Sequence, residues 1–239
     1  MDNWTHSSLS LKEGLKDGLA IGLGYFPVSF TFGILAVGQG LSWWQATFLS
    51  LLNLTSAGQF AGLDIMAQGG SLIEMALTQL VVNIRYSLMS IVIGQKADDT
   101  TDGWHRFLIP YTMTDEIFGV AAGKGQPVGF PYWVGLSTLP VIGWTAGTLA
   151  GSLLGQVLPQ RLSDALGIAL YAMFIAIIIP AAKKYRPVWF CIVVAVALAC
   201  LFHFIPFLSS VSSGFTVIIC GVSSAALCAW LFPVKEEEL

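Results

Sequence analysis

Charge is what this sequence has least of. Only 10% of its 239 residues are charged, whereas 55% are hydrophobic. A soluble domain usually carries about 25% charged residues, because they cover much of its hydrated surface. A charged fraction this small cannot cover a globule of this size. We therefore expect most of the surface to face the interior of a bilayer. The formal net charge of -3 also gives no electrostatic reason to bind nucleic acid.

The motifs of common enzymes and metal sites are missing too. The sequence contains no GxSxG, HExxH, Walker A or Rossmann pattern, so an ATP-driven motor within the chain is excluded. Its four cysteines form no CxxC pair and no cluster with histidine. All of them lie in the last two apolar stretches, as buried and reduced residues would. We therefore expect no metal and no cofactor.

Long apolar stretches are abundant instead. A membrane-spanning helix needs about 20 mainly apolar residues. Eight stretches qualify, at 18–38, 43–66, 71–94, 107–123, 131–156, 162–182, 187–206 and 211–233. The second is interrupted by polar residues from Asn53 to Gln59, and the fourth contains Asp115 and Glu116. The sequence predicts an all-α bundle of seven or eight transmembrane helices, depending on whether one segment is re-entrant, in a single domain over 1–239.

The basic residues predict an orientation for this bundle. With eight spans, one side carries Lys12, Lys16, Lys124, Lys183, Lys184, Arg186 and Lys235. The other side carries Lys96, Arg106 and Arg161. Because Lys and Arg concentrate in cytoplasmic loops, we expect both termini in the cytoplasm.

Glycine and proline suggest an internal repeat. Gly22-Leu23 and Pro27-Val28 resemble Gly135-Leu136 and Pro140-Val141, and transporter folds often contain such repeats. Chance similarity between glycine-rich apolar segments is the alternative. Glycines also recur every fourth residue, which favours close packing of helices in lipid. These rows are Gly14, Gly18 and Gly22, and Gly143, Gly147, Gly151 and Gly155.

Three charged residues lie inside predicted spans. Arg85 lies near the middle of 71–94, and Asp115 and Glu116 lie near the middle of 107–123. A charge in the membrane interior costs at least about 2.5–3.5 kcal/mol and therefore usually faces the inside of the bundle. Successive residues on a helix point about 100° apart, so one carboxylate can neutralise Arg85 while the other remains for a substrate amine or a proton. A purely structural salt bridge is the alternative.

The interruption in the second stretch is a candidate substrate site. Gly58 weakens the helix there, and Ser56 and Gln59 can bond to backbone groups that a break would free. Backbone dipoles at such a break suit the carboxylate and ammonium of an amino acid. A glycine-kinked helix that packs against its neighbours is the alternative.

Two other classes of function remain open. Asp98, Asp99 and Asp102 have the DDxxD spacing with which membrane prenyltransferases hold magnesium and a diphosphate, although no second copy of the motif is present. An acidic loop between helices explains the same residues. A passive channel would use the same polar residues without proton coupling.

Four motifs together resemble the AzlC family, the large subunit of branched-chain amino-acid exporters. They are Gly14 to Gly33 with Pro27, Ser56-Ala57-Gly58-Gln59-Phe60, Asn83-Ile84-Arg85-Tyr86 and Thr114-Asp115-Glu116-Ile117-Phe118. The motifs follow the order and approximate spacing of the family. Some members have Asp and His beside the arginine, where this chain has Asn83 and Tyr86.

The resemblance implies a bacterial or archaeal exporter in the cytoplasmic membrane. It implies leucine, isoleucine, valine and sometimes methionine as substrates, the proton gradient as driving force, and a small AzlD-type membrane subunit as partner. Residues and resemblance together predict substrate binding by Ser56, Gly58, Gln59, Asn83, Arg85 and Tyr86. They predict proton coupling or an ion pair for Thr114, Asp115 and Glu116. We expect a transporter and not an enzyme.

Overall fold

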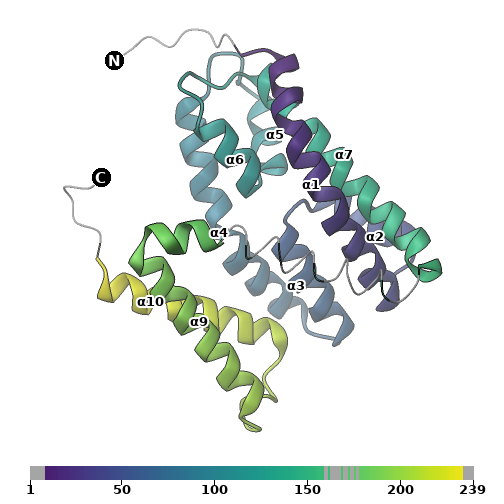
Figure 1. Cartoon of the computed structure of the whole chain (residues 1–239), viewed down its shortest axis with the longest axis vertical. Helices are drawn as coiled ribbons and strands as arrows, with labels where there is room; N and C mark the ends of the chain where they lie inside the picture. The colour runs from purple at the N-terminus through teal and green to yellow at the C-terminus, as the bar shows by residue number, and fades with distance from the viewer. Residues whose placement is uncertain are drawn as a thin grey trace. The chain divides into compact units, whose positions relative to one another are not determined.

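The structure is a computed structural model that describes residues 9–158 and 178–233, together with residues 161, 168, 172 and 175. Most of these residues are helical and none of them forms a strand, which confirms the predicted all-α class. The helices are α1 (Leu11–Gly38), α2 (Trp43–Leu52), α3 (Ser56–Ala67), α4 (Leu72–Lys96), α5 (His105–Thr112), α6 (Asp115–Ala122), α7 (Phe130–Leu154), α9 (Arg186–Phe204) and α10 (Ser213–Leu231), as labelled in Figure 1. The predicted span at 162–182 lies largely outside the described residues.

The chain divides into two compact units. The first takes the described residues of Met1–Gln59 and Asn83–Leu170, and the second those of Phe60–Val82 and Tyr171–Leu239. The chain passes from one unit to the other within α3 and again within α4. The prediction of a single domain over 1–239 stays a prediction.

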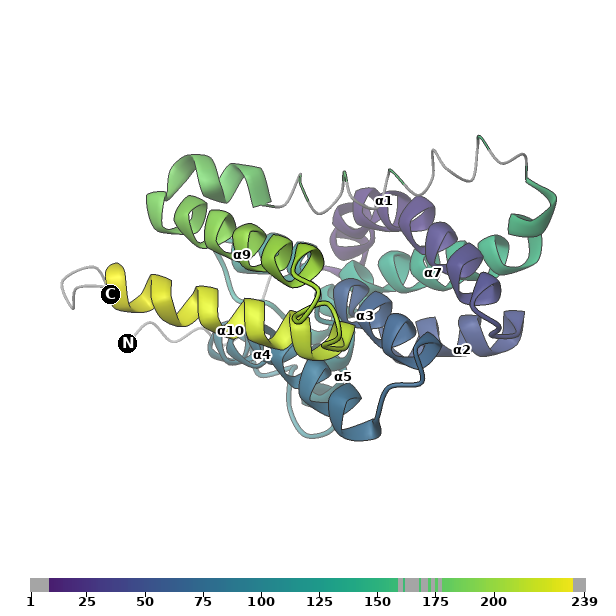
Figure 2. The ribbon, with the colours of Figure 1, turned by 90° about the horizontal axis from the view of Figure 1, so that it is seen from below.

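Helices α1 and α7 form the centre of the first unit and lie side by side in both ribbon views (Figure 1 and Figure 2). Glycines bring their backbones together. A Cβ atom on Gly14 would lie 2.2 Å from the carbonyl oxygen of Tyr132, and one on Gly151 would lie 2.0 Å from that of Phe30. Because the contacting positions advance together along both helices, α1 and α7 run parallel. The glycine rows therefore serve helix packing, as expected in lipid.

The second predicted span is broken at residues 53–55. Helix α2 ends at Leu52 and α3 begins at Ser56. The side-chain oxygen of Asn53 accepts hydrogen bonds from the N–H and the hydroxyl of Thr55, at 3.3 and 2.6 Å. The interruption predicted for Asn53 to Gln59 is thus present, although the helix resumes at Ser56 and includes Gly58.

A second break lies where the sequence predicts one continuous span at 107–123. Helices α5 and α6 occupy this stretch, and Met113 and Thr114 between them are extended. The hydroxyl of Thr114 accepts the N–H of Ile117 at 3.3 Å and so caps α6. Asp115 and Glu116 occupy the first turn of α6, where the helix dipole stabilises carboxylates.

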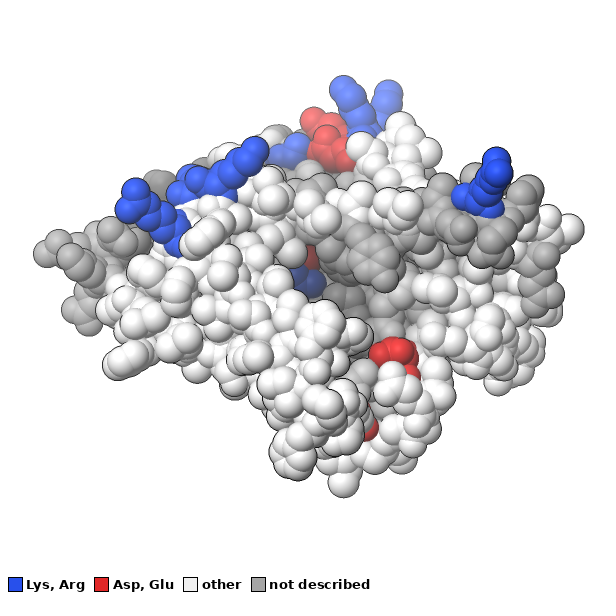
Figure 3. All heavy atoms as spheres, turned by 60° about the horizontal axis from the view of Figure 1, so that its bottom comes forward, with Lys and Arg blue, Asp and Glu red and all other residues white. Residues whose placement is uncertain are grey.

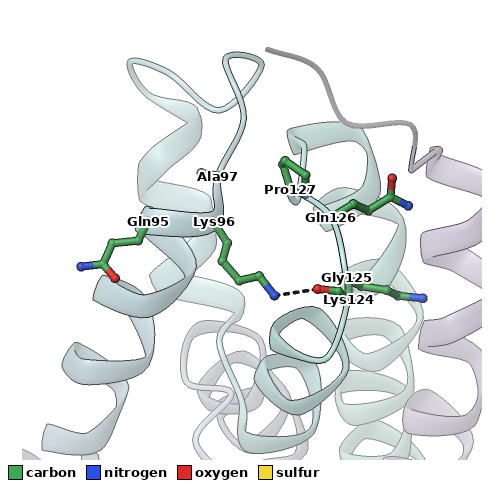
Figure 4. Close-up of a pocket in the computed structure, with 7 residues that line it drawn as sticks. All are labelled: Gln95, Lys96, Ala97, Lys124, Gly125, Gln126 and Pro127. Atoms are coloured by element: carbon green, nitrogen blue, oxygen red, sulfur yellow. Dashed lines mark hydrogen bonds between the residues drawn. The ribbon is translucent and has the colours of Figure 1, made fainter. Parts of the chain in front are cut away.

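Both ends of the α5–α6 pair lie at the same end of the first unit. The ring of His105, which begins α5, packs on that of Phe130, which begins α7, with centroids 4.0 Å apart. At the other end of the pair, Lys96 Nζ donates to the carbonyl oxygens of Ala122 and Lys124, at 2.6 and 2.7 Å. Figure 4 shows Lys96 extending from the end of α4 toward Lys124. The end of α4, the start of α5 and the end of α6 therefore meet.

The loops at this end bond to one another and to α1. The N–H of Val128 donates to the carbonyl oxygen of Lys96 at 2.8 Å, and Ala97 and Val128 form an isolated parallel bridge. Lys124 Nζ lies 2.7 Å from Asp17 Oδ2, near the start of α1. The beginnings of α1 and α7 thus lie beside the ends of α4 and α6.

The break between α5 and α6 lies much deeper along α1. Thr114 Oγ1 is 2.7 Å from the hydroxyl of Tyr25, eight residues beyond Asp17, which corresponds to about 12 Å of helix. Helix α5 therefore runs inward from the loops and α6 returns to them. This corrects the predicted span at 107–123, because the pair is re-entrant and does not cross the first unit.

The re-entrant pair also corrects the predicted distribution of basic residues. Lys96 and Arg106 were predicted on the side opposite Lys124, on the assumption that 107–123 crosses the membrane. Lys96 instead donates a hydrogen bond to the backbone of Lys124. Arg106 lies in the first turn of α5, at the same end of the unit. Together with Lys12 and Lys16 on α1, five basic residues lie at this end of the first unit.

Cysteine labelling tests this arrangement. In a background without the four native cysteines, we expect Asp99→Cys and Gly125→Cys to react with a membrane-impermeant maleimide from the same side of the membrane. Both positions are exposed, and a Cβ on Gly125 meets nothing within 4 Å. Gly38→Cys, at the far end of α1, is the control and should react from the opposite side. Labelling of Asp99→Cys and Gly125→Cys from opposite sides would contradict the re-entrant pair.

The second unit contains α9 and α10, which pack on each other, with the end of α3 and the start of α4. Glu74 in the first turn of α4 is 4% exposed. Its Oε1 accepts from the hydroxyl of Ser212 at 2.5 Å and from the N–H of Gly214 at 3.1 Å. This carboxylate therefore caps α10 and joins it to α4.

The outer surface fits a bilayer. Among the described residues, four helices are long and apolar enough to span a membrane, namely α1, α4, α9 and α10. Helix α9 buries none of its residues. On the face drawn in Figure 3, uncharged side chains cover most of the surface. The chain is thus a helical membrane protein. With 107–123 re-entrant, the eight apolar stretches allow at most seven spans, and the exact number and the internal repeat stay predictions.

Candidate functional site

Polar side chains from three helices of the first unit meet at the break between α5 and α6. Helix α1 contributes Tyr25, α4 contributes Arg85, and the start of α6 contributes Thr114, Asp115 and Glu116. Asp115 and Glu116 are neighbours in the first turn of α6, where successive side chains point about 100° apart. Asp115 therefore faces Arg85 on α4, and Glu116 faces Tyr25 on α1. We call these five residues the polar cluster.

Arg85 pairs with Asp115 and not with Glu116. Its Nη1 lies 2.7 Å from Asp115 Oδ2. The guanidinium also lies over the ring of Tyr86, 5.1 Å from the centroid, and Nη2 donates to the Tyr86 hydroxyl at 3.4 Å. Its buried Nε has no hydrogen-bond partner among the described residues. The guanidinium therefore keeps a buried donor for a further acceptor.

Glu116 has an uncharged partner instead. The Tyr25 hydroxyl lies 2.5 Å from Glu116 Oε2 and 2.7 Å from Thr114 Oγ1. Within the described part of the chain, Glu116 takes part in no ion pair. Of the two carboxylates that the sequence offers to Arg85, Asp115 is therefore neutralised and Glu116 is not.

A chain of contacts links the polar cluster to the broken helix α2–α3. The rings of Tyr25 and Trp144 meet edge to face, with centroids 5.5 Å apart. Trp144 Nε1 donates to Gln59 Oε1 at 2.9 Å, and Gln59 Nε2 donates to Ser50 Oγ at 2.5 Å. Ser50 Oγ in turn lies 2.7 Å from Thr148 Oγ1. Gln59 is 1% exposed and joins α2, α3 and α7 through both ends of its amide.

The two breaks also bond directly. The hydroxyl of Tyr111, near the end of α5, donates to the carbonyl oxygen of Leu51, near the end of α2. This carbonyl is one of the last four of α2, which have no partner within the helix. Tyr111 therefore satisfies a group that the break in the second span leaves free.

The other predicted substrate residues lie on α3 and α4. Ser56 begins α3, and its buried hydroxyl oxygen has no hydrogen-bond partner among the described residues. Such groups are rare in folded proteins unless they serve a ligand or water. Gly58 is buried in the first turn of α3, and Asn83 lies half-buried on α4, two residues before Arg85.

The acidic loop behind the enzyme alternative stabilises its own fold. Asp98 Oδ1 accepts from the N–H and hydroxyl of Thr100, at 2.9 and 2.5 Å. The hydroxyl of Thr100 then accepts the N–H of Phe130 at 2.9 Å. Asp99 and Asp102 are exposed. The described part of the chain contains no group of three or more His, Cys, Asp or Glu side chains that could hold a metal.

Tyr25 and Trp144 are the residues that the sequence analysis misses. Their signal was available, because both lie well inside long apolar stretches and away from the interfacial positions typical of aromatic residues. A buried tyrosine hydroxyl or tryptophan N–H usually finds a polar partner. Ser50 and Thr148 carry no comparable signal, since small hydroxyl residues are common in apolar helices.

Comparison with known proteins identifies the family. Residues 20–158 match the family described as AzlC protein, and this range is more than half of the chain. The chain belongs to the AzlC family. The matched range contains the whole polar cluster and both broken helices, so the site lies within the part that defines the family.

Several curated proteins are similar to this AzlC chain over part of their length. The inner membrane protein YgaZ of Escherichia coli (strain K12) is 34% identical over 122 residues, which are 49% of this chain and 48% of YgaZ. An uncharacterized membrane protein of Archaeoglobus fulgidus is 32% identical over 143 residues, which are 59% of this chain and 61% of that protein. The chain thus matches less than two thirds of the length of either relative. No solved structure gives a significant match.

AzlC membership and the membrane-protein relatives give the chain a role related to membrane transport. The AzlC family is associated with transport and is not an enzyme family. The substrate, the direction of transport and its coupling to protons require separate arguments.

Proposed function

We propose that this AzlC chain is a secondary transporter that exports branched-chain amino acids by alternating access, in exchange for protons. Leucine, isoleucine and valine are the main substrates, and methionine is a further one. The observation that carries the proposal is the meeting of two broken helices and a polar cluster inside one unit of a membrane protein.

Broken helices suit a substrate that carries both charges. The start of a helix presents backbone N–H groups to a carboxylate, and the end of a helix presents carbonyl oxygens to an ammonium group. Helices α2 and α5 end, and α3 and α6 begin, at two breaks that Tyr111 and Gln59 connect to one another. Backbone of this kind is tolerated within a membrane where protein or a water-filled cavity surrounds it.

The side chains provide matching groups. The free Nε donor of Arg85 and the unpartnered hydroxyl of Ser56 are donors for the substrate carboxylate. A carboxylate at the start of α6 accepts the substrate ammonium. In the proposed site Gly58 contributes backbone in the first turn of α3, Asn83 and Tyr86 flank Arg85, and Gln59 holds Trp144 against Tyr25.

We place the chain in the bacterial cytoplasmic membrane with both termini in the cytoplasm, which requires an even number of spans. Since 107–123 does not cross, the broken stretch at 43–66 is then the second stretch that does not cross fully. One relative is named an inner membrane protein. The five basic residues at the end where α1 begins favour the cytoplasm for that end. We also propose a small AzlD-type membrane subunit as partner, as the family resemblance implies.

Counterflow of radiolabelled leucine and valine in liposomes tests the proposed function. We expect uptake of both labels against an excess of unlabelled amino acid inside, with the chain alone or after addition of the small subunit. A pH jump should drive net flux if protons are coupled, whereas a passive channel would not respond to it. Absence of counterflow for leucine, isoleucine, valine and methionine under both conditions would contradict the proposal.

A further inference from the structure

We propose that Glu116 is the residue that carries the coupling proton, and that Tyr25 positions it and reports its protonation to α1. This inference rests on the proposed function and sharpens it, because the sequence leaves Asp115 and Glu116 as equal candidates. Asp115 has the separate task of holding Arg85.

Asp115 and Glu116 differ in whether a positive charge balances them. Arg85 carries one positive charge, which the Asp115 carboxylate neutralises at 2.7 Å. Glu116 adds a second negative charge without an ion-pair partner among the described residues. The cluster is therefore neutral only when Glu116 holds a proton. Since a net charge inside the membrane is costly, a neutral cluster is the form that moves most easily between the two orientations of a transporter.

Hydrogen bonding gives Glu116 two well-defined states. The hydroxyls of Tyr25 and Thr114 have one proton each, and Thr114 Oγ1 also accepts the N–H of Ile117. When Glu116 is ionised, the Tyr25 hydroxyl donates its single proton to Oε2 of Glu116. When Glu116 is protonated, its own O–H donates to Tyr25, and Tyr25 donates to Thr114. One added proton thus reverses the hydrogen bond between Glu116 and Tyr25 and redirects the Tyr25 proton to Thr114.

The position of Tyr25 makes this reversal relevant to movement. Tyr25 is buried on α1, which packs tightly on α7, and its ring touches Trp144. Trp144 bonds to Gln59 in the first turn of α3. The Tyr25 hydroxyl therefore connects the acid on the re-entrant pair to α7 and to the other broken helix.

Few titratable or charged groups face Glu116. Helix α1 contributes Tyr25, α4 contributes Arg85 and Tyr86, and α6 contributes Asp115. Trp144 from α7 contributes only an uncharged ring. Of these groups Asp115 is already paired, so Glu116 is the acid whose charge changes without breaking an ion pair.

The test compares two assays on the full chain in liposomes, with the small subunit where wild type requires it. Counterflow at equal pH on both sides needs substrate binding and movement but no net proton transfer. Accumulation driven by a pH gradient needs the proton as well. We expect Glu116→Gln, which keeps the shape and removes the charge, to retain counterflow and to lose gradient-driven accumulation. Asp115→Asn should lose both, because Arg85 is then unpaired.

Tyr25→Phe is the second variant and keeps the ring against Trp144. Ionised Glu116 loses a hydrogen-bond donor in this variant, so the pH midpoint of driven transport should move to higher pH. Asp17→Asn, an acid paired with Lys124 near the start of α1, is the control and should leave both assays unchanged.

Gradient-driven accumulation by Glu116→Gln would overturn the inference. Loss of counterflow in a Glu116→Gln protein that elutes as a single folded species would overturn it too, since Glu116 would then be needed by the substrate itself. An unchanged pH midpoint in Tyr25→Phe contradicts the role of Tyr25. Failure of wild type in counterflow is a distinct result and concerns the proposed function instead.

Discussion

Replacing Gly151 by leucine should prevent the chain from folding into a stable membrane protein. Its Cβ would lie 2.0 Å from the carbonyl oxygen of Phe30 and 2.7 Å from the carbonyl carbon, and neither atom can move without shifting α1. Overpacking a core by side chains costs about 1–3 kcal/mol, and a clash with backbone costs more. We expect a loss of monodisperse protein after extraction in detergent, measured by size-exclusion chromatography and thermal unfolding.

Gly24→Leu is the matched control for this substitution. Gly24 lies on α1 as well, but a Cβ there meets nothing within 4 Å. Its yield and its midpoint of thermal unfolding should stay close to those of wild type. Equal behaviour of Gly151→Leu and Gly24→Leu would show that α1 and α7 do not approach as closely as the glycine rows indicate.

Arg85→Ala should reduce transport by about 100-fold or more. The substitution leaves Asp115 and Glu116 as two negative charges inside the membrane, and an isolated charge there costs at least about 2.5–3.5 kcal/mol. A cost of this size on the transport cycle corresponds to about two powers of ten in rate. Counterflow of leucine in liposomes, normalised to folded protein, measures the effect.

The double variant Arg85→Ala with Asp115→Ala distinguishes a role of Arg85 in binding substrate from a role in holding α4 and α6 together. It removes both charges, so the protein should fold at wild-type levels but still not transport, because the donor for the substrate carboxylate is gone. Normal transport by the double variant would mean that the ion pair only holds α4 and α6 together.

The Lys124–Asp17 pair is the matched control, because its atoms are also 2.7 Å apart but it lies at the end of the unit. The Lys124 and Asp17 side chains are 29% and 27% exposed, so water reaches this pair at the loop end of the unit and it contributes only about 0–1 kcal/mol. Lys124→Ala with Asp17→Ala should therefore transport nearly normally.

The membrane location and the helical class follow from the sequence alone. Scarce charge and repeated apolar stretches are properties of composition, and a bilayer accepts such stretches only as helices when no closed barrel is available. The break in the second span is also visible in the sequence, because Asn53, Thr55, Ser56 and Gly58 all disfavour an uninterrupted apolar helix. The glycine rows likewise predict close packing, although they do not identify the partner helix.

The tertiary structure alone decided how these segments turn and pair. The hydropathy of a stretch describes only how apolar its residues are. One helix that crosses the membrane and two short helices that enter and return can have the same hydropathy. The stretch at 107–123 breaks at Met113 and Thr114, and its return is held by Lys96, which binds the backbone at Ala122 and Lys124 from more than 25 positions away.

The same holds for the two neighbouring acids. The sequence places Asp115 and Glu116 side by side with equal claims on Arg85. Only the packing of α4 on one side and α1 on the other gives Asp115 the arginine and Glu116 the tyrosine. The residue types in the sequence thus determined which side chains could form the site. Contacts between helices that are distant in the sequence determined which side chain pairs with which.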